Sequence, residues 1–263
     1  KMRKLSIVKI GGNVLDNTKA LEKFLTDFAA LEGAKVLVHG GGKLATELAQ
    51  KIGIEQTLVE GRRITDAETL KITVMVYAGL LNKQVVAALQ AKNTQAIGLS
   101  GADANMIRTT KRPTNPIDYG FVGDIDSESV HKNMLVKLID LGLVPVFSAI
   151  THNGQGQLLN TNADTIASAL ALAMAESYEV QLIYCFEKNG VLRNIEDENS
   201  VIPIITKTIY TDLRREGVIS TGMIPKIDNA FAAIENGVKA VRIIHADNLL
   251  SIDDDKKGTT LIA

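Results

Sequence analysis

The sequence predicts an α/β fold, a three-layer αβα sandwich with helices on both faces of a mostly parallel central sheet. Strand-like apolar runs alternate along the chain with segments of helical periodicity, as in folds built from parallel β-α-β units. The first two runs, at residues 5–10 and 35–38, each lead directly into glycines. Ligands of open α/β sheets bind at the carboxyl ends of the strands. We therefore expect the functional site at that edge of the sheet.

In the first half of the chain, the helix at 18–31 is indicated by Leu21, Phe24 and Phe28, which recur at helical spacing. Thr65-Asp66-Ala67-Glu68 has the pattern of a capping box, which predicts that a long helix begins there and runs towards Ala91. Residues 100–126 contain glycines and prolines with little periodicity and are expected to form a loop or hairpin region. The other elements expected in this half are strands at 5–10, 35–38 and 96–99 and a helix at 43–52.

In the second half, Asn162-Ala163-Asp164 opens an alanine-rich helix that reaches about Ala175. The other expected elements are helices at 129–141, 206–216 and 224–235 and strands at 143–147, 180–186, 239–244 and 259–262. A linker rich in proline or serine does not divide the chain. We therefore predict two lobes of one sheet, an N-terminal lobe at 1–175 and a C-terminal lobe at 176–263.

The composition excludes several classes of protein. The net charge of −1 over 263 residues gives no overall field that would attract nucleic acid or an anionic membrane. The apolar stretch at 166–175 is far shorter than the ~20 residues of a membrane span, and the start of the chain lacks a signal-peptide pattern. A single cysteine, Cys185, excludes an internal disulfide framework. We expect a cytoplasmic protein without nucleic-acid or membrane partners.

Two glycine turns carry the functional prediction. Lys9-Ile10-Gly11-Gly12 follows the first strand and His39-Gly40-Gly41-Gly42 follows the second. Neither matches the P-loop or the dinucleotide fingerprint. Exposed N–H groups beside a helix N-terminus bind anions. Two such turns on two strands therefore predict a phosphoryl-transfer site, although tight strand-to-helix turns also use glycine.

A small set of polar residues accompanies these turns. Lys9 at the strand end is either an edge lysine or a positive charge directed at the ligand. Lys226 falls near a predicted helix N-terminus, where a cation is unfavourable unless an anion is bound. Asp164 is either a helix cap or an anionic group that orients two lysines. Asn160 and Arg63 are candidates for binding a substrate amide and a substrate carboxylate.

The remaining candidates have simpler explanations. The four histidines, His39 among them, show no metal-ligand spacing, and we predict no metal ligands from the protein. His39 is interpreted as a hydrogen-bonding residue at the strand end. Cys185, between Tyr184 and Phe186, is interpreted as a small buried apolar residue.

Five segments together resemble the amino-acid kinase superfamily, and within it most closely the acetylglutamate kinase family. The resemblance extends from Lys9 to the final Gly258-Thr259-Thr260. Each motif alone is weak, but the five in this order are specific. The segments are Lys9–Gly12, His39–Gly42, Gly61–Thr65, Asn160–Asp164 and Gly222–Lys226.

The resemblance implies an amino-acid kinase fold and transfer of the γ-phosphoryl group of ATP to the side-chain carboxylate of an N-acylated glutamate, a step of arginine biosynthesis. Lys9 and Lys226 would stabilise the transferred group as catalytic residues, with Asp164 holding both. The other implied contacts are Gly11 and Gly12 with phosphate, Gly41 and Gly42 with acceptor and phosphate, Arg63 with the acceptor α-carboxylate, and Asn160 with its amide.

The resemblance places the nucleotide in the C-terminal lobe, with Mg²⁺ held by the nucleotide phosphates. The implied nucleotide-binding residues are Cys185, Phe186, Gly190, Val191, Leu192, Val218, Ile219 and Ser220. The family usually has a Thr/Ser-Asp-Val-x-Gly turn here, whereas this chain reads Tyr184–Gly190 with Cys185 in place of Asp and a longer loop. Because no long segment precedes the first strand, the chain resembles the dimeric members that arginine does not inhibit.

Three alternatives remain open at this stage. N-succinylglutamate replaces N-acetylglutamate in some lineages, and its additional carboxylate would need a cation, for which Arg108, Lys111 and Arg112 are candidates. Gly11-Gly12-Asn13-Val14-Leu15 is also similar to a carbamate kinase motif. A non-catalytic amino-acid sensor is the alternative from a different class, and retention of both lysines argues against it.

Overall fold

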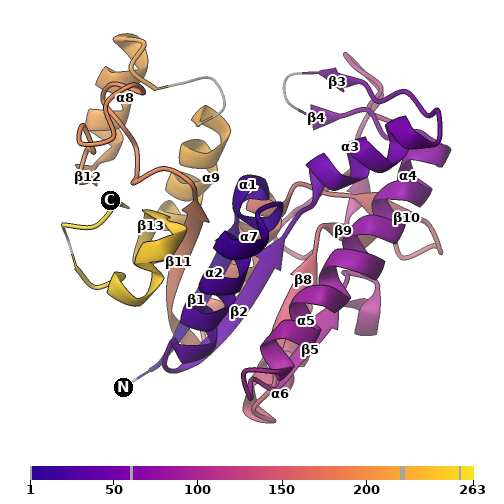
Figure 1. Ribbon diagram of the computed structural model, residues 1–263, viewed down its shortest axis with the longest axis horizontal. Coiled ribbons are helices and arrows are strands. Elements are labelled where there is room, and N and C mark those ends of the chain that lie inside the picture. Colours follow the sequence, from indigo (N-terminus) through magenta and orange to yellow (C-terminus); the bar gives the residue numbers. More distant parts are fainter. Residues whose placement is uncertain (1, 60–61, 220–222, 255) are drawn as a thin grey trace.

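The computed structural model describes residues 2–59, 62–219, 223–254 and 256–263 (Figure 1). Its central sheet has eight strands, and all neighbouring strands are parallel except the pair β13–β14. The order across the sheet is β12 (Ile204–Ile205), β14 (Thr259–Leu261), β13 (Ala240–His245), β11 (Tyr178–Phe186), β1 (Arg3–Ile10), β2 (Ala34–His39), β8 (Val144–Ser148) and β5 (Ala96–Leu99).

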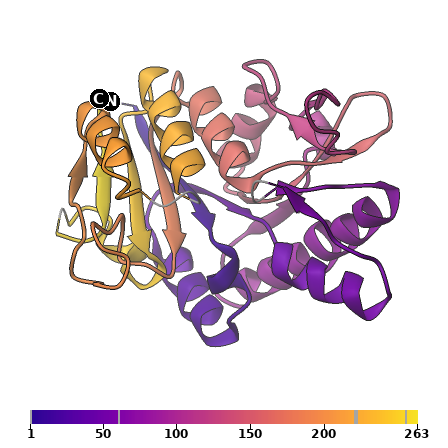
Figure 2. The same cartoon turned by 90° about the horizontal axis from the view of Figure 1, so that it is seen from above.

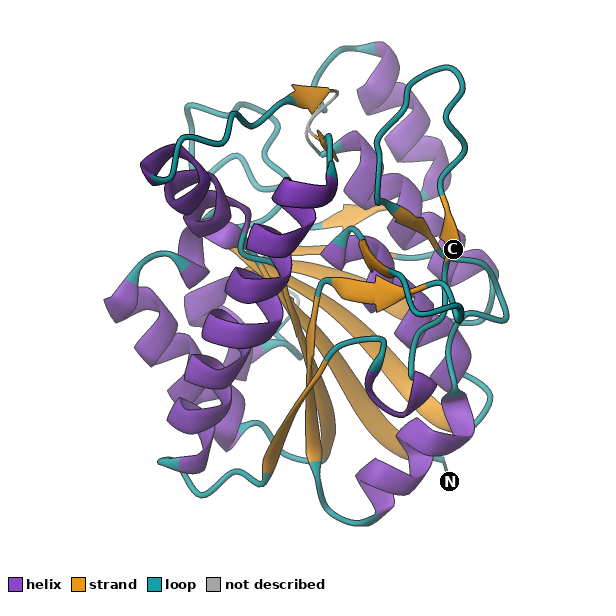
Figure 3. Cartoon of the chain, turned by 90° about the vertical axis from the view of Figure 1, so that its right-hand side faces the viewer, coloured by secondary structure: helices purple, strands orange, loops and turns teal. Residues whose placement is uncertain are grey.

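Helices cover both faces of this sheet (Figures 2 and 3). On one face lie α6 (Lys132–Asp140), α7 (Ala163–Met174) and α9 (Ile224–Glu235). On the other lie α2 (Thr18–Ala30), α5 (Asn82–Gln90) and the 3₁₀ helix η3 (Ala246–Ser251). Near the sheet edge, α8 (Lys207–Arg215) packs on α9 by stacking Tyr210 on Phe231, with ring centroids 5.6 Å apart. The predicted three-layer sandwich is confirmed.

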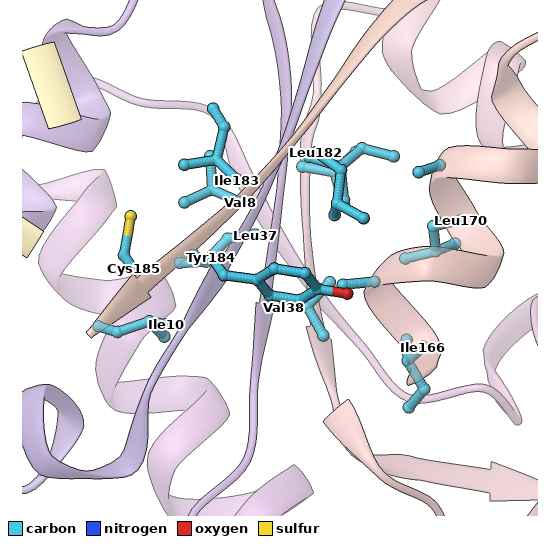
Figure 4. Packing of buried hydrophobic residues seen from close by; sticks show 14 of the residues in the cluster. Val8, Ile10, Leu37, Val38, Ile166, Leu170, Leu182, Ile183, Tyr184 and Cys185 are labelled. Atoms are coloured by element: carbon cyan, nitrogen blue, oxygen red, sulfur yellow. The ribbon is translucent and has the colours of Figure 1, made fainter. Parts of the chain in front are cut away.

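The central strands are buried on both faces, which explains their nearly continuous apolar sequences. Figure 4 shows the packing around β11, where Leu182 and Tyr184 point towards the helix that carries Ile166 and Leu170. The Tyr184 hydroxyl lies 2.8 Å from the Ser168 hydroxyl and donates to the carbonyl oxygen of Asp164. These contacts fix the first turns of α7 against β11, directly beneath the Asp164 side chain.

The long helix predicted after residue 65 is present but contains an irregularity. It consists of α4 (Ala67–Val74), a π-helical segment η1 (Met75–Leu81) and α5. Its cap is Asp66, which accepts a hydrogen bond from the Thr69 N–H at 2.8 Å, so the prediction that Thr65 caps the helix was wrong. By length and composition this helix could cross a membrane. It contributes Val76 and the α5 residues that contact β5 and β8 to the core, as core helices of globular folds do.

Several short elements were not anticipated. They are the edge strand β12 of the central sheet, the one-turn helix α1 (Gly12–Leu15), the strand pair β3 (Leu58–Val59) and β4 (Arg62–Arg63), and the strand pair β9 (Ile150–His152) and β10 (Leu158–Asn160). The region at 100–126 forms the expected hairpin, with β6 (Thr110–Lys111) paired to β7 (Gly123–Asp124). Bridges at Thr65–Gly120 and Val122–Asn160 tie these hairpins together. With α3 (Gly42–Lys51), they form the wall beside the carboxyl edge of β1 and β2 (Figure 1).

The sheet continues across the predicted boundary between the lobes. β1, in the first lobe, pairs with β11, in the second, from Arg3–Tyr178 to Ile10–Cys185. The two lobes therefore share one continuous sheet. The division at residue 175 remains a prediction that acylglutamate binds to one lobe and ATP to the other.

Candidate active site

The structure brings Lys9, Asp164 and Lys226 together at the carboxyl edge of the sheet. Lys9 comes from the end of β1, Asp164 from the first turn of α7 and Lys226 from the first turn of α9. Lys9 Nζ lies 2.8 Å from Asp164 Oδ1, and Lys226 Nζ lies 2.5 Å from Asp164 Oδ2. The side chains of Lys9, Asp164 and Lys226 are 13%, 9% and 27% exposed. Segments 217 residues apart in sequence thus place two cations on one carboxylate.

The Asp164 carboxylate is charged because of its two neighbours. Burial alone would raise its pKa, but Lys9 and Lys226 overcome this effect and lower the pKa to about 2. Oδ1 has no well-directed hydrogen bond, so its contact with Lys9 is chiefly an ion pair. The cap of α7 is Asn162, whose side chain accepts from the N–H groups of Asp164 and Thr165. The interpretation of Asp164 as the helix cap was therefore wrong, and its carboxylate serves the lysines.

Both glycine turns present N–H groups at the same edge. The Gly11 N–H donates to the Cys185 carbonyl oxygen at 2.8 Å, which joins this turn to the end of β11. Within the described part of the chain, the N–H groups of Gly12, Gly41 and Gly42 find no acceptor. Gly41 has a φ of +150° and begins α3 as its N-cap. A Cβ at this residue would lie 2.4 Å from Leu81 Cδ1, so the turn requires glycine.

A cavity of about 470 Å³ adjoins Lys9 and the glycine turns, whereas Lys226 is not among its lining residues. Its lining unites most of the predicted acceptor and phosphate residues, namely Lys9, Gly12, Gly41, Gly42, Arg63 and Asn160. One end of this cavity is formed by the glycine turns and the other by the hairpins above the sheet. The shape and the positive charge suit a small acid.

Arg63 is buried in the wall of this cavity and is already held by the protein. Its Nη2 donates to the Gly42 carbonyl oxygen at 2.7 Å and to the Thr46 hydroxyl at 2.8 Å, and its Nη1 donates to Gln56. At least three of its five N–H donors are therefore engaged by the protein, which fixes the position of the guanidinium. Asn160 donates to the Thr65 hydroxyl at 3.1 Å, which leaves its amide oxygen at the cavity.

Two residues of this cavity were not among those assigned to acetylglutamate binding from the sequence: Tyr77 was missed, and Arg112 was named only as a candidate cation for N-succinylglutamate. Tyr77 lies in the π-helical segment, and its ring packs on Gly41 near the guanidinium of Arg63. Arg112 sits in the β6–β7 hairpin, with its Nε and Nη2 on Asp124 and its guanidinium 5.2 Å from the ring centre of Tyr119. The π-helical segment that brings Tyr77 to the cavity has no sequence signature, so periodicity alone could not find this residue.

A second cavity, of about 440 Å³, lies in the C-terminal half. It is lined by six of the predicted nucleotide-binding residues, Phe186, Gly190, Val191, Leu192, Val218 and Ile219. The side chain of Cys185 instead lies in the core beside Ile10 (Figure 4), and burial raises the pKa of its thiol. Ser220 lies outside the described residues. Lys188, Arg193 and Met223 also line this cavity and were not predicted.

Two further observations concern metal ligands and the remaining cavity. In the described residues, no group of three or more His, Cys, Asp or Glu side chains is arranged to hold a metal ion. A cavity of about 510 Å³ at the opposite edge of the sheet is lined by residues such as Lys4, Ser6 and Gln181, from the amino-terminal parts of β1 and β11. It is therefore separated from the lysines by the length of the strands.

The sheet with its two glycine turns, and the two lysines that meet at its carboxyl edge, define an α/β protein of the kinase class. Residues 4–245 match the amino acid kinase family, and the chain belongs to that family. The acetylglutamate kinase of Cytophaga hutchinsonii is 54% identical to it over 265 residues, which cover 100% of both chains. This similarity places the chain among the acetylglutamate kinases and confirms the predicted family.

Solved structures agree on the fold. The protein smu.665 of Streptococcus mutans is 25% identical, with a TM-score of 0.81 and 98% of each chain covered. The carbamate kinase of Giardia lamblia bound to AMP-PNP has a TM-score of 0.72 at 15% identity, with 99% of this chain and 98% of that chain covered. At that identity the likeness to carbamate kinase concerns the fold alone.

Proposed function

We propose that this chain transfers the γ-phosphoryl group of ATP to the side-chain carboxylate of N-acetyl-L-glutamate, as a step of arginine biosynthesis. The observation that carries the proposal is the pair of lysines on Asp164, adjacent to the cavity lined by Arg63 and Asn160. The chain's similarity over its full length to acetylglutamate kinases supports the choice of acceptor.

The residues present suit this chemistry. The acceptor carboxylate is ionised at pH 7, so the reaction needs no general base. The obstacle is the approach of two anions and the charge that spreads over the transferred group. Lys9 and Lys226 offer positive charge to that group, and the free N–H groups of Gly12, Gly41 and Gly42 offer hydrogen bonds. Asp164 positions both ammonium groups and balances part of their charge.

Substrates are assigned to the two cavities. The acetylglutamate would lie in the cavity of the N-terminal lobe, with its α-carboxylate at the guanidinium of Arg63 and its amide at Asn160. The nucleotide would lie in the second cavity, which the backbone at Gly190 and the side chains of Val191 and Leu192 border. Mg²⁺ would be held by the nucleotide phosphates and would neutralise part of their charge.

A hydroxamate assay tests this function. Purified protein is incubated with ATP, Mg²⁺, hydroxylamine and a panel of acids that includes N-acetylglutamate, N-succinylglutamate, glutamate and carbamate. We expect ADP release and hydroxamate formation with N-acetylglutamate. Turnover of carbamate alone would favour the carbamate kinase alternative, and absence of turnover with every acid would favour a non-catalytic sensor.

One observation favours a second acceptor. Arg112 lines the acceptor cavity, and its Nη1 has no hydrogen-bond partner among the described residues. N-succinylglutamate carries an additional carboxylate that would pair with this guanidinium, whereas an acetyl group would not. Comparison of kcat/KM for the two acylglutamates in the wild type and in Arg112→Gln decides the matter. A selective loss of the succinyl reaction in the variant supports this acceptor, and a clear acetyl preference in the wild type excludes it.

We also propose a homodimer formed through the N-terminal lobe. Met75 and Leu80 of the π-helical segment are 56% and 48% exposed, and nothing lies within 4 Å of a Cβ built at Gly79 between them. An apolar face of this kind on a helix suits a second copy of the chain. Sedimentation of the wild type and of Leu80→Glu checks this arrangement, since only the variant should sediment as a monomer. The cytoplasmic location remains a prediction, supported by the need for ATP.

A further inference from the structure

The buried histidine that precedes the second glycine turn makes two hydrogen bonds that the proposed mechanism does not use. His39 Nδ1 lies 2.9 Å from the carbonyl oxygen of Gly40, and His39 Nε2 lies 3.1 Å from Asn82 Nδ2. The Asn82 amide also donates to the carbonyl oxygen of Val146 at 2.9 Å, while its Oδ1 accepts from Lys83 Nζ at 3.1 Å. His39 and Asn82 are both almost inaccessible to water.

These contacts determine which nitrogen of His39 carries the proton. The Asn82 nitrogen can only donate, so Nε2 of His39 must accept. In the neutral ring, Nδ1 then carries the hydrogen and donates it to the Gly40 carbonyl oxygen. Burial lowers the pKa of His39 to about 4, assisted by the charge of Lys83 and opposed by the bond to Gly40. The ring is therefore neutral at pH 7, and its one N–H, at Nδ1, donates to the carbonyl oxygen of Gly40.

The hydrogen bond to Gly40 sets the direction of the next N–H group. In a trans peptide the carbonyl of one residue and the N–H of the following residue point in opposite directions. Since the Gly40 carbonyl is held towards the buried ring of His39, the Gly41 N–H points away from it. Gly41 borders the acceptor cavity, and its N–H has no acceptor within the described residues.

The π-helical segment holds the other side of the same turn. Leu81 and Tyr77 are the side chains nearest to a Cβ built at Gly41, at 2.4 and 3.0 Å. Asn82 follows Leu81 directly, so one irregular stretch of helix both packs on Gly41 and fixes the tautomer of His39. Such π-helical segments are frequent at functional sites because they redirect side chains.

We infer that His39 and Asn82 are positioning residues, which hold the Gly40–Gly41 peptide so that the Gly41 N–H faces the transferred phosphoryl group. This inference rests on the proposed role of Gly41 and extends it to a pair of residues that lie behind the turn. Neither His39 nor Asn82 lines the acceptor cavity, so neither is expected to touch the substrate.

Replacement of the amide by a carboxylate gives a distinctive test. In Asn82→Asp, residue 82 no longer donates to Nε2, and the ring must carry a proton there. The doubly protonated ring still donates from Nδ1 to Gly40, but the neutral ring keeps its proton on Nε2 and loses that bond. Lys83 is the charged group acting on the ring from α5, and the paired residues Ile10 of β1 and Ser148 of β8 are uncharged.

The kcat of Asn82→Asp should therefore fall as pH rises through a new ionisation between about pH 6 and 8, by about tenfold. Wild-type kcat should show no such ionisation in that range, because its His39 remains neutral there. The KM for ATP should change little in either protein. A flat kcat profile for Asn82→Asp, parallel to the wild type, would overturn the inference.

Two matched variants of His39 test the same inference if Asn82→Asp does not fold. His39→Asn retains an N–H donor near the place of Nδ1, whereas His39→Leu has similar size and no donor. We expect kcat of His39→Leu to be about tenfold below that of His39→Asn, with similar melting temperatures and similar affinity for AMP-PNP. Equal kcat values for the two variants would contradict the inference.

Lys9→Ala, measured in parallel, separates this inference from the proposed function. Loss of activity in Lys9→Ala with no effect of the His39 and Asn82 changes would refute the positioning role alone. Retention of activity in Lys9→Ala would refute the assignment of the site itself.

Discussion

Replacement of Asp164 by asparagine is the most informative single change at the site. Asn is of similar size and keeps one oxygen acceptor, but it removes the negative charge between Lys9 and Lys226. The pKa of Asp164 is lowered from its ordinary 3.8 to about 2 even though burial opposes ionisation. This difference corresponds to about 2 kcal/mol in favour of the ionised folded protein.

The sign of this contribution gives a pH signature. A carboxylate whose pKa is lower in the folded state stabilises the protein above about pH 4, and the stabilisation is lost as pH falls towards 2. Asp164→Asn should lower the free energy of unfolding at pH 7 by about 2 kcal/mol and show less loss of stability in acid. Its kcat should fall by about a hundredfold, because both ammonium groups lose the anion that positions them.

Urea denaturation at several pH values and steady-state kinetics measure both effects. Glu68→Gln supplies a matched control, since its ion pair with Lys71 lies on the surface with side chains 59% and 66% exposed. Removal of such a pair should cost less than about 1 kcal/mol and leave kcat unchanged. An Asp164→Asn protein that matches this control in both stability and kcat would refute the reasoning.

Three further changes have definite expected outcomes. Gly41→Ala should lower both the melting temperature and kcat, because a Cβ there would lie 2.4 Å from Leu81 and the φ of +150° disfavours alanine. Unchanged values would show that this turn does not require glycine. Leu192→Trp should raise the KM for ATP about tenfold or more by filling the second cavity, while the KM for acetylglutamate stays nearly constant. The opposite result would reverse the assignment of the two substrates to the two cavities. The free energy of unfolding of the wild type should decrease by up to about 3 kcal/mol as pH falls from about 6.5 to 4, because the pKa of His39 is lower in the folded state. His39→Asn should lack this decrease when the free energy of unfolding is measured over the same pH range.

The alternation of apolar runs and helical periods was sufficient to predict the α-helices that cover the sheet and every strand of the sheet except β12. The helix expected at 18–31, for example, is Thr18–Ala30, because Phe24 and Phe28 recur at the spacing of one buried face. The hairpins β3–β4 and β9–β10 were missed because their strands have only two or three residues. Such short strands depend on tertiary pairing, which local sequence does not encode.

Part of the candidate site could also be predicted from the sequence. Lys9 and Gly41 could be singled out because they follow buried strands at the edge where ligands bind, and Lys226 because a cation is unfavourable at a helix N-terminus. The partnership with Asp164 was one of two interpretations of that residue, and the resemblance favoured it, because the distance in sequence hides the contact. Tyr77 and Arg112 reach the acceptor cavity through a π-helical segment and a hairpin, and both depend on the completed fold.

We propose that Lys9 and Lys226 bind the phosphoryl group more tightly in the transition state than in the substrates. Calorimetry with MgADP, aluminium fluoride and N-acetylglutamate measures this directly, because the fluoride complex mimics the transferred group. Lys9→Met and Lys226→Met should weaken this complex by about a hundredfold or more, while the Kd for N-acetylglutamate alone should change only a few-fold. Wild-type affinity for the fluoride complex in both variants would contradict it.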